Sequence, residues 1–390
     1  MKKMAHENNR KRTVYFVSDI YPTVDQPYLG QYIIDQANSF VESRNGKITF
    51  LFIKPFFGKK FDFNFVQKQL RKEIRLHIIR VIPAPNYRFI WLKKISFLLS
   101  LTILRLIRHV PIRDSVFHSH SLSCNYLLSI NLLKSNKRVV TIHGEEAENI
   151  ISRPRLKKRF TKTLNEVNKV VIVGEPLKKY LSFFEVQNSK TIIIPNGIHD
   201  RSNMPIPEIG NKINILCVAR LSPEKNIISL IQAINVLVKK KLNNFILTIV
   251  GEGPLKLKIE NEILKFKLSK KIKILAPMSP NKILGMYQKS NIFCLPSYKE
   301  AFGLVHAEAM SFGLITIGSK GTGPEMFIQN NKNGYLVNSK SVEEISEVLG
   351  YVINNIKEVS HIAKSAKRTI HEKFSWAESS SLLEKTYENL

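Results

Sequence analysis

Acidic residues and cysteines are scarce in this 390-residue chain. It has 31 Asp and Glu against 60 Lys and Arg, which gives a formal net charge of +29, and it has three cysteines. Cys124, Cys217 and Cys294 lie in apolar surroundings and share no spacing typical of metal ligands. This pattern indicates buried free thiols in a reducing compartment rather than a disulfide framework or a zinc site.

The chain also lacks a long hydrophobic run. The longest, ISFLLSLTIL at residues 95–104, has ten residues, whereas a helix that spans a bilayer needs about 20. The basic amino-terminal segment leads into a short strand-like run and not into the apolar core of a signal peptide. We therefore expect a cytoplasmic protein.

Positive charge is concentrated in the first 200 residues, where 34 Lys and Arg minus 15 Asp and Glu leave +19. Basic clusters occur at residues 71–75, 88–113 and 153–159. The middle cluster mixes aromatic and aliphatic residues with lysines and arginines, as an interfacial helix does. We expect contact with an anionic membrane surface, although a core-packed helix with a solvated basic face is the alternative. A nucleic-acid partner is not expected, because no binding module is present.

Short β-branched runs alternate with helix-length segments along the whole chain. Their continuous hydrophobicity is typical of strands covered on both faces, hence of parallel sheets. Strands are expected at 13–19, 47–53, 75–81, 115–118, 138–143, 169–173 and 191–195, and again at 213–219, 245–251, 271–275, 291–296 and 314–318. The pattern predicts two Rossmann-like doubly wound α/β domains, 1–199 and 200–375, that face each other across a cleft. A last helix, 376–390, is expected to pack back on the first domain.

The segment PSYKEAFGLVHAEAMSFG, residues 296–313, places Glu300 and Glu308 in otherwise apolar or small surroundings. A helix that begins near Phe302 would offer free N–H groups around Phe302, Gly303 and Leu304 to a phosphate. Glu308 would lie about 9 Å further along the helix axis. A nucleoside diphosphate sugar has matching parts, a diphosphate and two sets of hydroxyl groups. The alternative is that Glu308 is an ordinary solvated helix residue.

Other motifs also follow predicted strands. ARLSPEKN, residues 219–226, offers Arg220 and Lys225 to one phosphate group. VGEGPLK and GSKGTGPE are glycine loops without the spacing of a dinucleotide fold. His143 follows the strand VVTI, and either a sugar contact or a structural role fits it. His118 and His120 share a strand face, but a metal site would need a third ligand that the sequence does not provide.

Taken together and in this order, these motifs resemble the retaining family-four glycosyltransferases of the GT-B fold. PSYKEAFGLVHAEAMSFG is similar to the Glu-x7-Glu signature of that family, ARLSPEK to its phosphate clamp, GEGP to its glycine loop and TIHG to its sugar-facing histidine. YPTVDQPYLGQYIIDQA fits the loop that opens the first domain, with Gly30 alone where many members have two glycines.

The resemblance implies a role for each matching residue. Glu308 would bind the ribose, and Glu300 and His143 the transferred sugar. Arg220, Lys225 and the N–H groups near Phe302, Gly303 and Leu304 would stabilise the departing diphosphate, with Gly251 and Gly30 beside the donor.

It also implies a metal-independent transferase with no cofactor. We expect a UDP-sugar rather than a GDP-sugar as donor and a glycan or lipid-linked molecule as acceptor. The basic clusters described above, and not the resemblance, indicate a location at the inner face of the cell membrane. The alternatives are a non-catalytic protein of the same fold that binds polyanions or membranes, and another sugar-nucleotide enzyme such as an epimerase.

Overall fold

The computed structural model describes residues 12–24, 26–44, 48–56, 62–83, 90–108, 114–130, 133, 135–144 and 146–390. These residues form two compact units. Unit 1 contains residues 1–173, 177–195 and 376–390, and unit 2 contains residues 174–176 and 196–375. The chain thus enters unit 2 near residue 196, four residues before the expected boundary, and its last helix belongs to unit 1.

Unit 1 is built on a seven-stranded sheet in the order β3-β2-β1-β4-β5-β6-β7. Every neighbouring pair is parallel, as the continuous hydrophobic runs predict. The strands are β1 (Val14–Ser18), β2 (Ile48–Pro55), β3 (Arg75–Val81), β4 (Val116–Ser119), β5 (Lys137–Ile142), β6 (Lys169–Ile172) and β7 (Thr191–Ile193).

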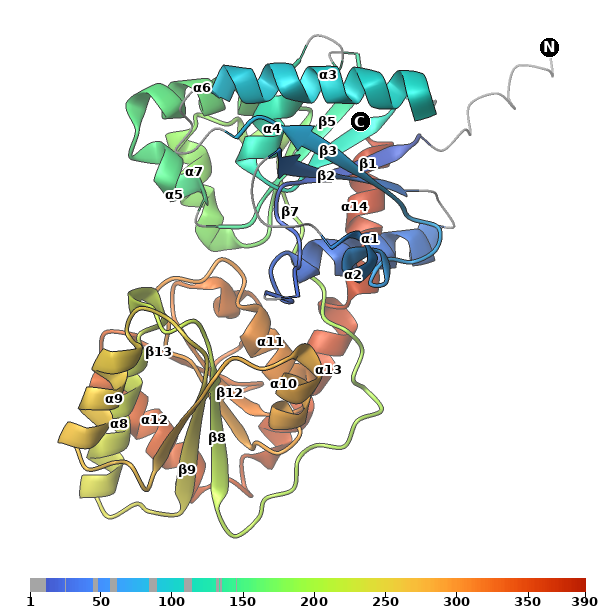
Figure 1. The fold of residues 1–390 in the computed structure, drawn as a ribbon. Coiled ribbons are helices and arrows are strands. Elements are labelled where there is room, and N and C mark those ends of the chain that lie inside the picture. Colours follow the sequence, from blue (N-terminus) through green and yellow to red (C-terminus); the bar gives the residue numbers. More distant parts are fainter. Residues whose placement is uncertain are drawn as a thin grey trace. The chain divides into compact units, whose positions relative to one another are not determined.

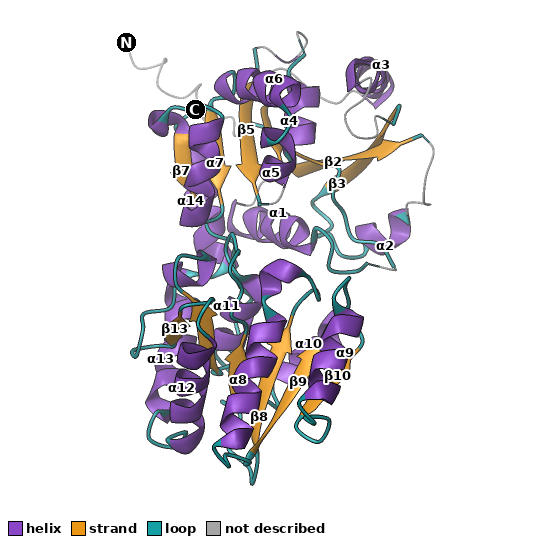
Figure 2. Cartoon of the chain, turned by 90° about the vertical axis from the view of Figure 1, so that its left-hand side faces the viewer, coloured by secondary structure: helices purple, strands orange, loops and turns teal. Residues whose placement is uncertain are grey.

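Helices cover both faces of this sheet (Figures 1 and 2). One face packs against α1 (Gln31–Arg44), α2 (Phe63–Gln67) and α14 (Trp376–Glu388) through an aromatic-rich core. The other packs against α3 (Ile90–Arg108) and α4 (Leu122–Leu128), with α6 (Pro154–Asn165) beside α4. The remaining helices are α5 (Glu146–Ile151) and α7 (Lys178–Phe183).

Unit 2 has a six-stranded parallel sheet in the order β10-β9-β8-β11-β12-β13. Its strands are β8 (Ile213–Val218), β9 (Phe245–Val250), β10 (Ile272–Leu275), β11 (Ile292–Cys294), β12 (Ile315–Ser319) and β13 (Tyr335–Val337). Its helices are α8 (Ile227–Lys239), α9 (Lys256–Lys265), α10 (Pro280–Tyr287), α11 (Leu304–Ser311), α12 (Val342–Asn354) and α13 (Ser360–Lys373). The strands expected from the sequence do not include β13.

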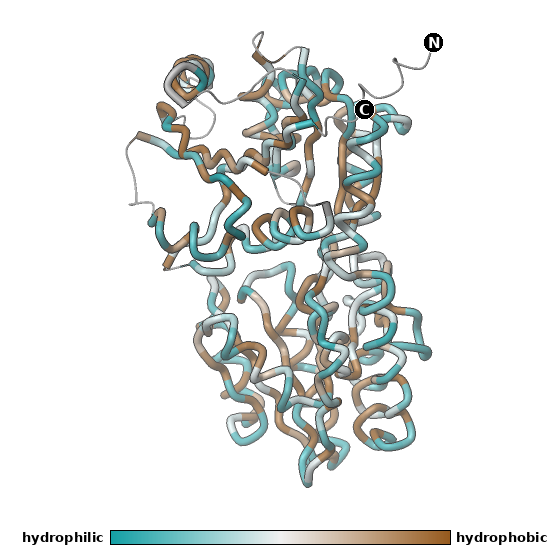
Figure 3. The backbone as a smooth tube through the Cα atoms, turned by 90° about the vertical axis from the view of Figure 1, so that its right-hand side faces the viewer, coloured by the Kyte–Doolittle hydropathy of each residue, from teal (hydrophilic) through white to brown (hydrophobic). Residues whose placement is uncertain are grey.

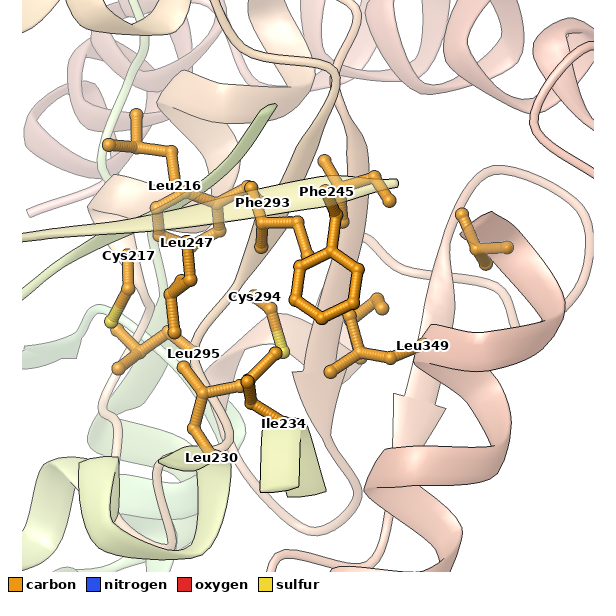
Figure 4. Close-up of a cluster of buried hydrophobic side chains, with 14 of the residues drawn as sticks. Leu216, Cys217, Leu230, Ile234, Phe245, Leu247, Phe293, Cys294, Leu295 and Leu349 are labelled. Carbon is orange, nitrogen blue, oxygen red and sulfur yellow. The ribbon is translucent and has the colours of Figure 1, made fainter. Parts of the chain in front are cut away.

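The core of unit 2 joins β8, β9 and β11 to helices α8 and α12 (Figure 4). Cys217 and Cys294 belong to this core, and Cys124 lies in the core of unit 1, so all three cysteines are buried free thiols. In both units the hydrophobic segments run along the strands (Figure 3). Among the described residues, no helix is both long and apolar enough to cross a membrane.

Candidate active site

In unit 2 the predicted motifs gather where the strand order reverses. β8 and β11 are neighbours in the sheet, whereas the chain goes from β8 to β9 and β10 before it returns to β11. Ligands of doubly wound sheets bind beyond the carboxyl ends of the strands at such a point. Arg220 and Lys225 follow β8, and Glu300 follows β11.

The loops after β8 and β11 are joined directly. The backbone N–H of Tyr298 donates to the carbonyl of Glu224 at 3.0 Å. Lys225 Nζ lies 2.8 Å from Glu300 Oε1, and the two side chains are only 20% and 13% exposed. Ser297 Oγ donates to the same carboxylate oxygen at 3.2 Å. The sequence assigned Lys225 and Glu300 to different parts of a ligand, and the structure brings them into one ion pair.

Arg220 is the exposed cation of this site. Its side chain is on the surface, and no hydrogen bond or ion pair joins it to another residue of the described chain. A guanidinium in this position has all its donors available to an incoming anion.

Helix α11 begins two residues later than the sequence predicted. We expected a start near Phe302, but the first helical residue is Leu304 and Gly303 precedes it in a left-handed conformation, with φ of +91°. Phe302 is buried, with its ring against those of Phe327 and Phe374. Its side chain therefore belongs to the core, and only its backbone can face a ligand.

The first turn of α11 leaves backbone donors open. The N–H groups of His306 and Ala307 both bond to the carbonyl of Gly303. The N–H groups of Leu304 and Val305 have no acceptor within the described part of the chain. Unpaired N–H groups at a helix N-terminus attract anions, and the helix dipole strengthens this effect. The expected anion site therefore moves to Leu304 and Val305.

Gly303 is required by both its conformation and its neighbours. Residues with a side chain rarely adopt a φ of this value. A Cβ atom at this position would also lie 2.8 Å from Cγ of Pro324, which is in the loop after β12. The backbone at the start of α11 is thus close to the loop that contains GSKGTGPE, and the N–H of Gly323 donates to the carbonyl of Glu300 at 3.0 Å.

Glu308 has a protein partner that the sequence did not reveal. The hydroxyl of Tyr287, at the end of α10, donates to Glu308 Oε2 at 2.9 Å. Tyr287 is fully buried and stacks on Phe312 with 5.5 Å between ring centroids. Burial and the adjacent carboxylate of Glu308 raise the pKa of Tyr287 well above its usual range. The phenol therefore remains a donor, and it holds one side of the Glu308 carboxylate in place.

Gly251, predicted beside the donor, has a packing reason of its own. Its φ is +155°, and a Cβ atom there would lie 1.8 Å from the carbonyl oxygen of Ala219. The N–H of Leu221 bonds to the carbonyl of Glu252 at 2.9 Å. The glycine loop after β9 thus supports the loop that contains Arg220.

In unit 1 the strand order reverses between β1 and β4. Gly30 directly precedes α1 and has φ of +73°, and His143 follows β5. His143 Nε2 lies 3.4 Å from His120 Nδ1, and its ring is 4.6 Å from that of Tyr32. The structure therefore surrounds the predicted sugar-facing histidine with other rings.

His118 and His120 stack with 4.3 Å between their ring centroids, as expected for two residues on one strand face. His118 lies 2.5 Å from the hydroxyl of Tyr387 and 2.6 Å from that of Thr141. Burial lowers the pKa of His118 to about 3 and that of His120 well below its usual range. Within the described ranges, no three His, Cys, Asp or Glu side chains are arranged to hold a metal.

A polar network at the same edge of unit 1 also escaped the sequence analysis. The carboxylate of Glu146 accepts the N–H groups of Leu122 and Ser123, at the start of α4, at 2.8 and 2.9 Å. Ser121 Oγ donates to Asp19 at 2.8 Å. Burial and the neighbouring Asp19 raise the pKa of Glu146 to about 7. Neither acid belongs to a recognisable sequence motif, so only the fold reveals their proximity.

Comparison with known proteins links both halves of the chain to enzymes that transfer sugars. Residues 199–369 match the family model "Glycosyl transferases group 1", and residues 57–201 match "Glycosyltransferase Family 4". The first match contains the loops with Arg220, Lys225 and Glu300 and the helix with Glu308. The second contains His143.

Curated relatives give the same result over part of their length. The chain is 28% identical over 255 residues to an uncharacterized glycosyltransferase of Methanocaldococcus jannaschii. This alignment covers 65% of this chain and 68% of that protein. It is 29% identical over 258 residues to the poly(ribitol-phosphate) alpha-N-acetylglucosaminyltransferase of Staphylococcus aureus. That alignment covers 65% of this chain and 50% of the relative.

Solved structures share the fold over almost the whole chain. The Anabaena protein HepE in complex with UDP aligns with a TM-score of 0.74 at 14% identity, over 97% of this chain and 100% of that one. Two Rossmann-like units with seven and six parallel strands are those of the GT-B fold. The chain belongs to the glycosyltransferases, with a family-four-like amino-terminal half and a group 1 carboxyl-terminal half.

Proposed function

We propose that this protein transfers a sugar from a nucleoside diphosphate sugar, with UDP preferred over GDP, to a glycan or lipid-linked acceptor at the inner surface of the cell membrane. The anomeric configuration is retained and no metal takes part. The observation that carries this proposal is the cluster of Arg220, the Lys225–Glu300 pair and the open N–H groups of α11 beyond the strands of unit 2.

The donor is held through three contacts. The diphosphate lies against the N–H groups of Leu304 and Val305, with Arg220 and Lys225 as counter-charges. Glu308, fixed by Tyr287, accepts hydrogen bonds from the ribose hydroxyls. Glu300, held in place by its ion pair with Lys225, accepts hydrogen bonds from the hydroxyls of the transferred sugar.

The reaction breaks the bond between the anomeric carbon and the diphosphate oxygen, and the electron pair leaves with that oxygen. The acceptor hydroxyl attacks the same face of the sugar, and its proton passes to the departing phosphate. The transition state has an oxocarbenium-like sugar and a phosphate oxygen with growing negative charge. Cations and N–H dipoles that are already in place stabilise that charge. Since Arg220 and Lys225 supply this positive charge, a chelator is expected to leave the rate unchanged.

Named relatives support the nature of donor and acceptor. HepE has been crystallised with UDP and glucose. The Staphylococcus aureus relative is a poly(ribitol-phosphate) alpha-N-acetylglucosaminyltransferase, whose name gives a polymer as the acceptor. In unit 1, His143 and the loop around Gly30 lie at the sheet edge where ligands of such folds bind, and we assign His143 to the transferred sugar and Gly30 to the site wall.

Ligand-induced shifts in melting temperature test this proposal. UDP and UDP-sugars are expected to stabilise the protein more than GDP and GDP-sugars do, because a ligand that binds only the folded state raises its stability. Glu308→Ala should reduce the shift strongly. Glu347→Ala, which removes an exposed glutamate from α12, is the control and should keep it. No shift with any nucleotide, or an unchanged shift in Glu308→Ala, would reject the donor site.

A further inference from the structure

Helix α3 has its apolar side chains on the outside. Between residues 91 and 105, where its side chains are described, five large apolar residues are exposed: Trp91 (53%), Ile95 (49%), Leu98 (37%), Leu99 (60%) and Ile103 (55%). Steps of three and four residues place them on one side of a helix. The outward arc contains no charged residue, whereas the outward face of a soluble surface helix is normally polar.

The lysines of α3 point toward the protein instead. Lys93 Nζ donates to Ser123 Oγ at 3.1 Å and lies 3.8 Å from Asp19 Oδ2. Lys94 Nζ donates to Ser129 Oγ at 2.9 Å and lies 4.8 Å from the ring centroid of Tyr126. The two lysines in the first turns of α3 thus have partners within the protein, whereas the apolar side of the helix is exposed to solvent. Lys93 and Lys94 therefore do not form a solvated basic face on α3.

A cationic helix lies in the same layer. Helix α6 contains no acidic residue and exposes Arg155, Lys158, Arg159 and Lys162, which are spaced as one helical face. Its opposite side buries Phe160 and other core residues. Helix α4 contacts both α3 and α6, so the three helices form one layer on the sheet (Figures 1 and 2). The apolar stripe of α3 and the cations of α6 therefore face outward on the same side of unit 1.

We propose that this side of unit 1 docks on an anionic lipid bilayer, with the α3 stripe inserted among the headgroups and the α6 cations against lipid phosphates. Apolar side chains flanked by cations match the surface of an anionic bilayer, where negatively charged headgroups cover an apolar layer of acyl chains. Association of two copies through the same stripe would bring the two α6 faces and two chains of net charge +29 together, which electrostatics opposes. The inference rests on the membrane-surface location in the proposed function, and it names the residues that produce it.

Flotation with vesicles tests the docking surface. The full chain should float with vesicles of mixed phosphatidylcholine and phosphatidylglycerol and remain at the bottom with phosphatidylcholine alone. The double substitution Leu99→Ser and Ile103→Ser removes apolar area without a change of charge, and it should reduce the bound fraction at least tenfold. Leu257→Ser with Leu264→Ser is the matched control, because these leucines are 69% and 65% exposed on α9 of unit 2. The control should float like the wild type.

The cations of α6 are tested in the same assay. Arg155→Gln with Lys158→Gln should weaken binding by roughly fivefold for each charge removed, as expected for basic residues near anionic lipid. Lys239→Gln with Lys240→Gln removes two exposed charges from the carboxyl-terminal end of α8, where Lys240 is the capping residue, and should change binding much less. An equal loss of vesicle binding in the two double variants would show that only net charge matters and would overturn the assignment to α6.

Tryptophan fluorescence supplies an independent readout. The chain has two tryptophans, the exposed Trp91 and the buried Trp376. Anionic vesicles should shift the emission of the wild type to shorter wavelength, because the Trp91 ring leaves water, and Trp91→Phe should abolish the shift while flotation persists. An unshifted emission from vesicle-bound wild type would show that α3 does not insert.

Three outcomes decide the inference. Wild-type protein that stays at the bottom with anionic vesicles, or α3 variants that float as well as the α9 control, overturns it. A dimer that light scattering detects in the wild type and not in the α3 variants would assign the stripe to self-association instead. The UDP-induced shift in melting temperature should be unchanged in the α3 variants, so failure of docking and failure of the donor site are distinguishable.

Discussion

The contact between Tyr287 and Glu308 gives a sharp test of the donor site. Tyr287→Phe removes one hydroxyl and keeps a fully buried ring that stacks on Phe312. The lost bond is 2.9 Å long and ends on a carboxylate oxygen. Hydrogen bonds to charged groups contribute about 1.5–3 kcal/mol. If half of this energy orients Glu308 toward the ribose, the affinity for the donor falls by roughly threefold to tenfold.

The kinetic pattern matters more than the size of the loss. The ribose is remote from the reacting carbon, so its contacts are equal in the ground state and the transition state. Loss of such uniform binding raises KM and leaves kcat unchanged. Tyr287→Phe should therefore raise KM for the donor by roughly threefold to tenfold, with kcat within about twofold of the wild type. Initial rates at varied donor concentration measure both constants.

A double-mutant cycle with Glu308→Ala identifies the route of the effect. If Tyr287 acts through Glu308, adding Tyr287→Phe to Glu308→Ala should change KM no further. Tyr351→Phe, on the exposed face of α12, is the matched control. Independent, additive effects of Tyr287→Phe and Glu308→Ala on donor KM would refute the reasoning, as would a lower kcat at unchanged KM.

Three further predictions concern the ion pair, the helix start and the buried histidines. Lys225→Gln should lower kcat about a hundredfold, because it removes positive charge beside the departing phosphate. It should also cost about 1–3 kcal/mol in urea unfolding, because the largely buried Glu300 carboxylate loses its partner; a kcat near that of the wild type would contradict this. Gly303→Ala should cost about 1–3 kcal/mol in urea unfolding, since it forces a strained backbone and a contact with Pro324. The lowered pKa values of His118 and His120 mean that the unfolded chain binds more protons below about pH 6.5. Stability should therefore fall as pH drops from 6.5 toward 3, by up to about 1.4 kcal/mol per pH unit for each ring. The raised pKa of Glu146 acts in the opposite direction above about pH 4.5 and offsets the contribution of one ring there. A flat unfolding free energy over this range would show that these rings are protonated in the folded protein.

Most of the fold could be predicted because its strands are continuous apolar runs. Each of the twelve strands expected from the sequence occurs within a few residues of its expected place. β13 was missed because Tyr335–Val337 has three residues at a sheet edge, directly after a turn that contains Asn333 and Gly334. Such a short run cannot be distinguished from a loop by its pattern alone.

The sequence names candidate residues for the site but does not reveal the contacts between them. Glu308 and Tyr287 are 21 residues apart, and Lys225 and Glu300 are 75 apart. No local pattern reports which of two distant side chains meet. The start of α11 was placed two residues early because the helix was expected to follow the loop SYKE directly, and only the backbone shows that Gly303 turns left-handed. The inward direction of Lys93 and Lys94 likewise depends on α4, which the sequence could not place beside α3.

The anomeric configuration of the product tests the central claim most directly. The wild-type protein would be incubated with α-linked UDP-glucose or UDP-N-acetylglucosamine and an alcohol or glycan acceptor, and the first product followed by proton NMR. The account predicts that a UDP-sugar is consumed in the presence of a chelator and that the new linkage is α. A β-linked product, or no consumption of any UDP-sugar by protein that is folded and binds UDP, would contradict it.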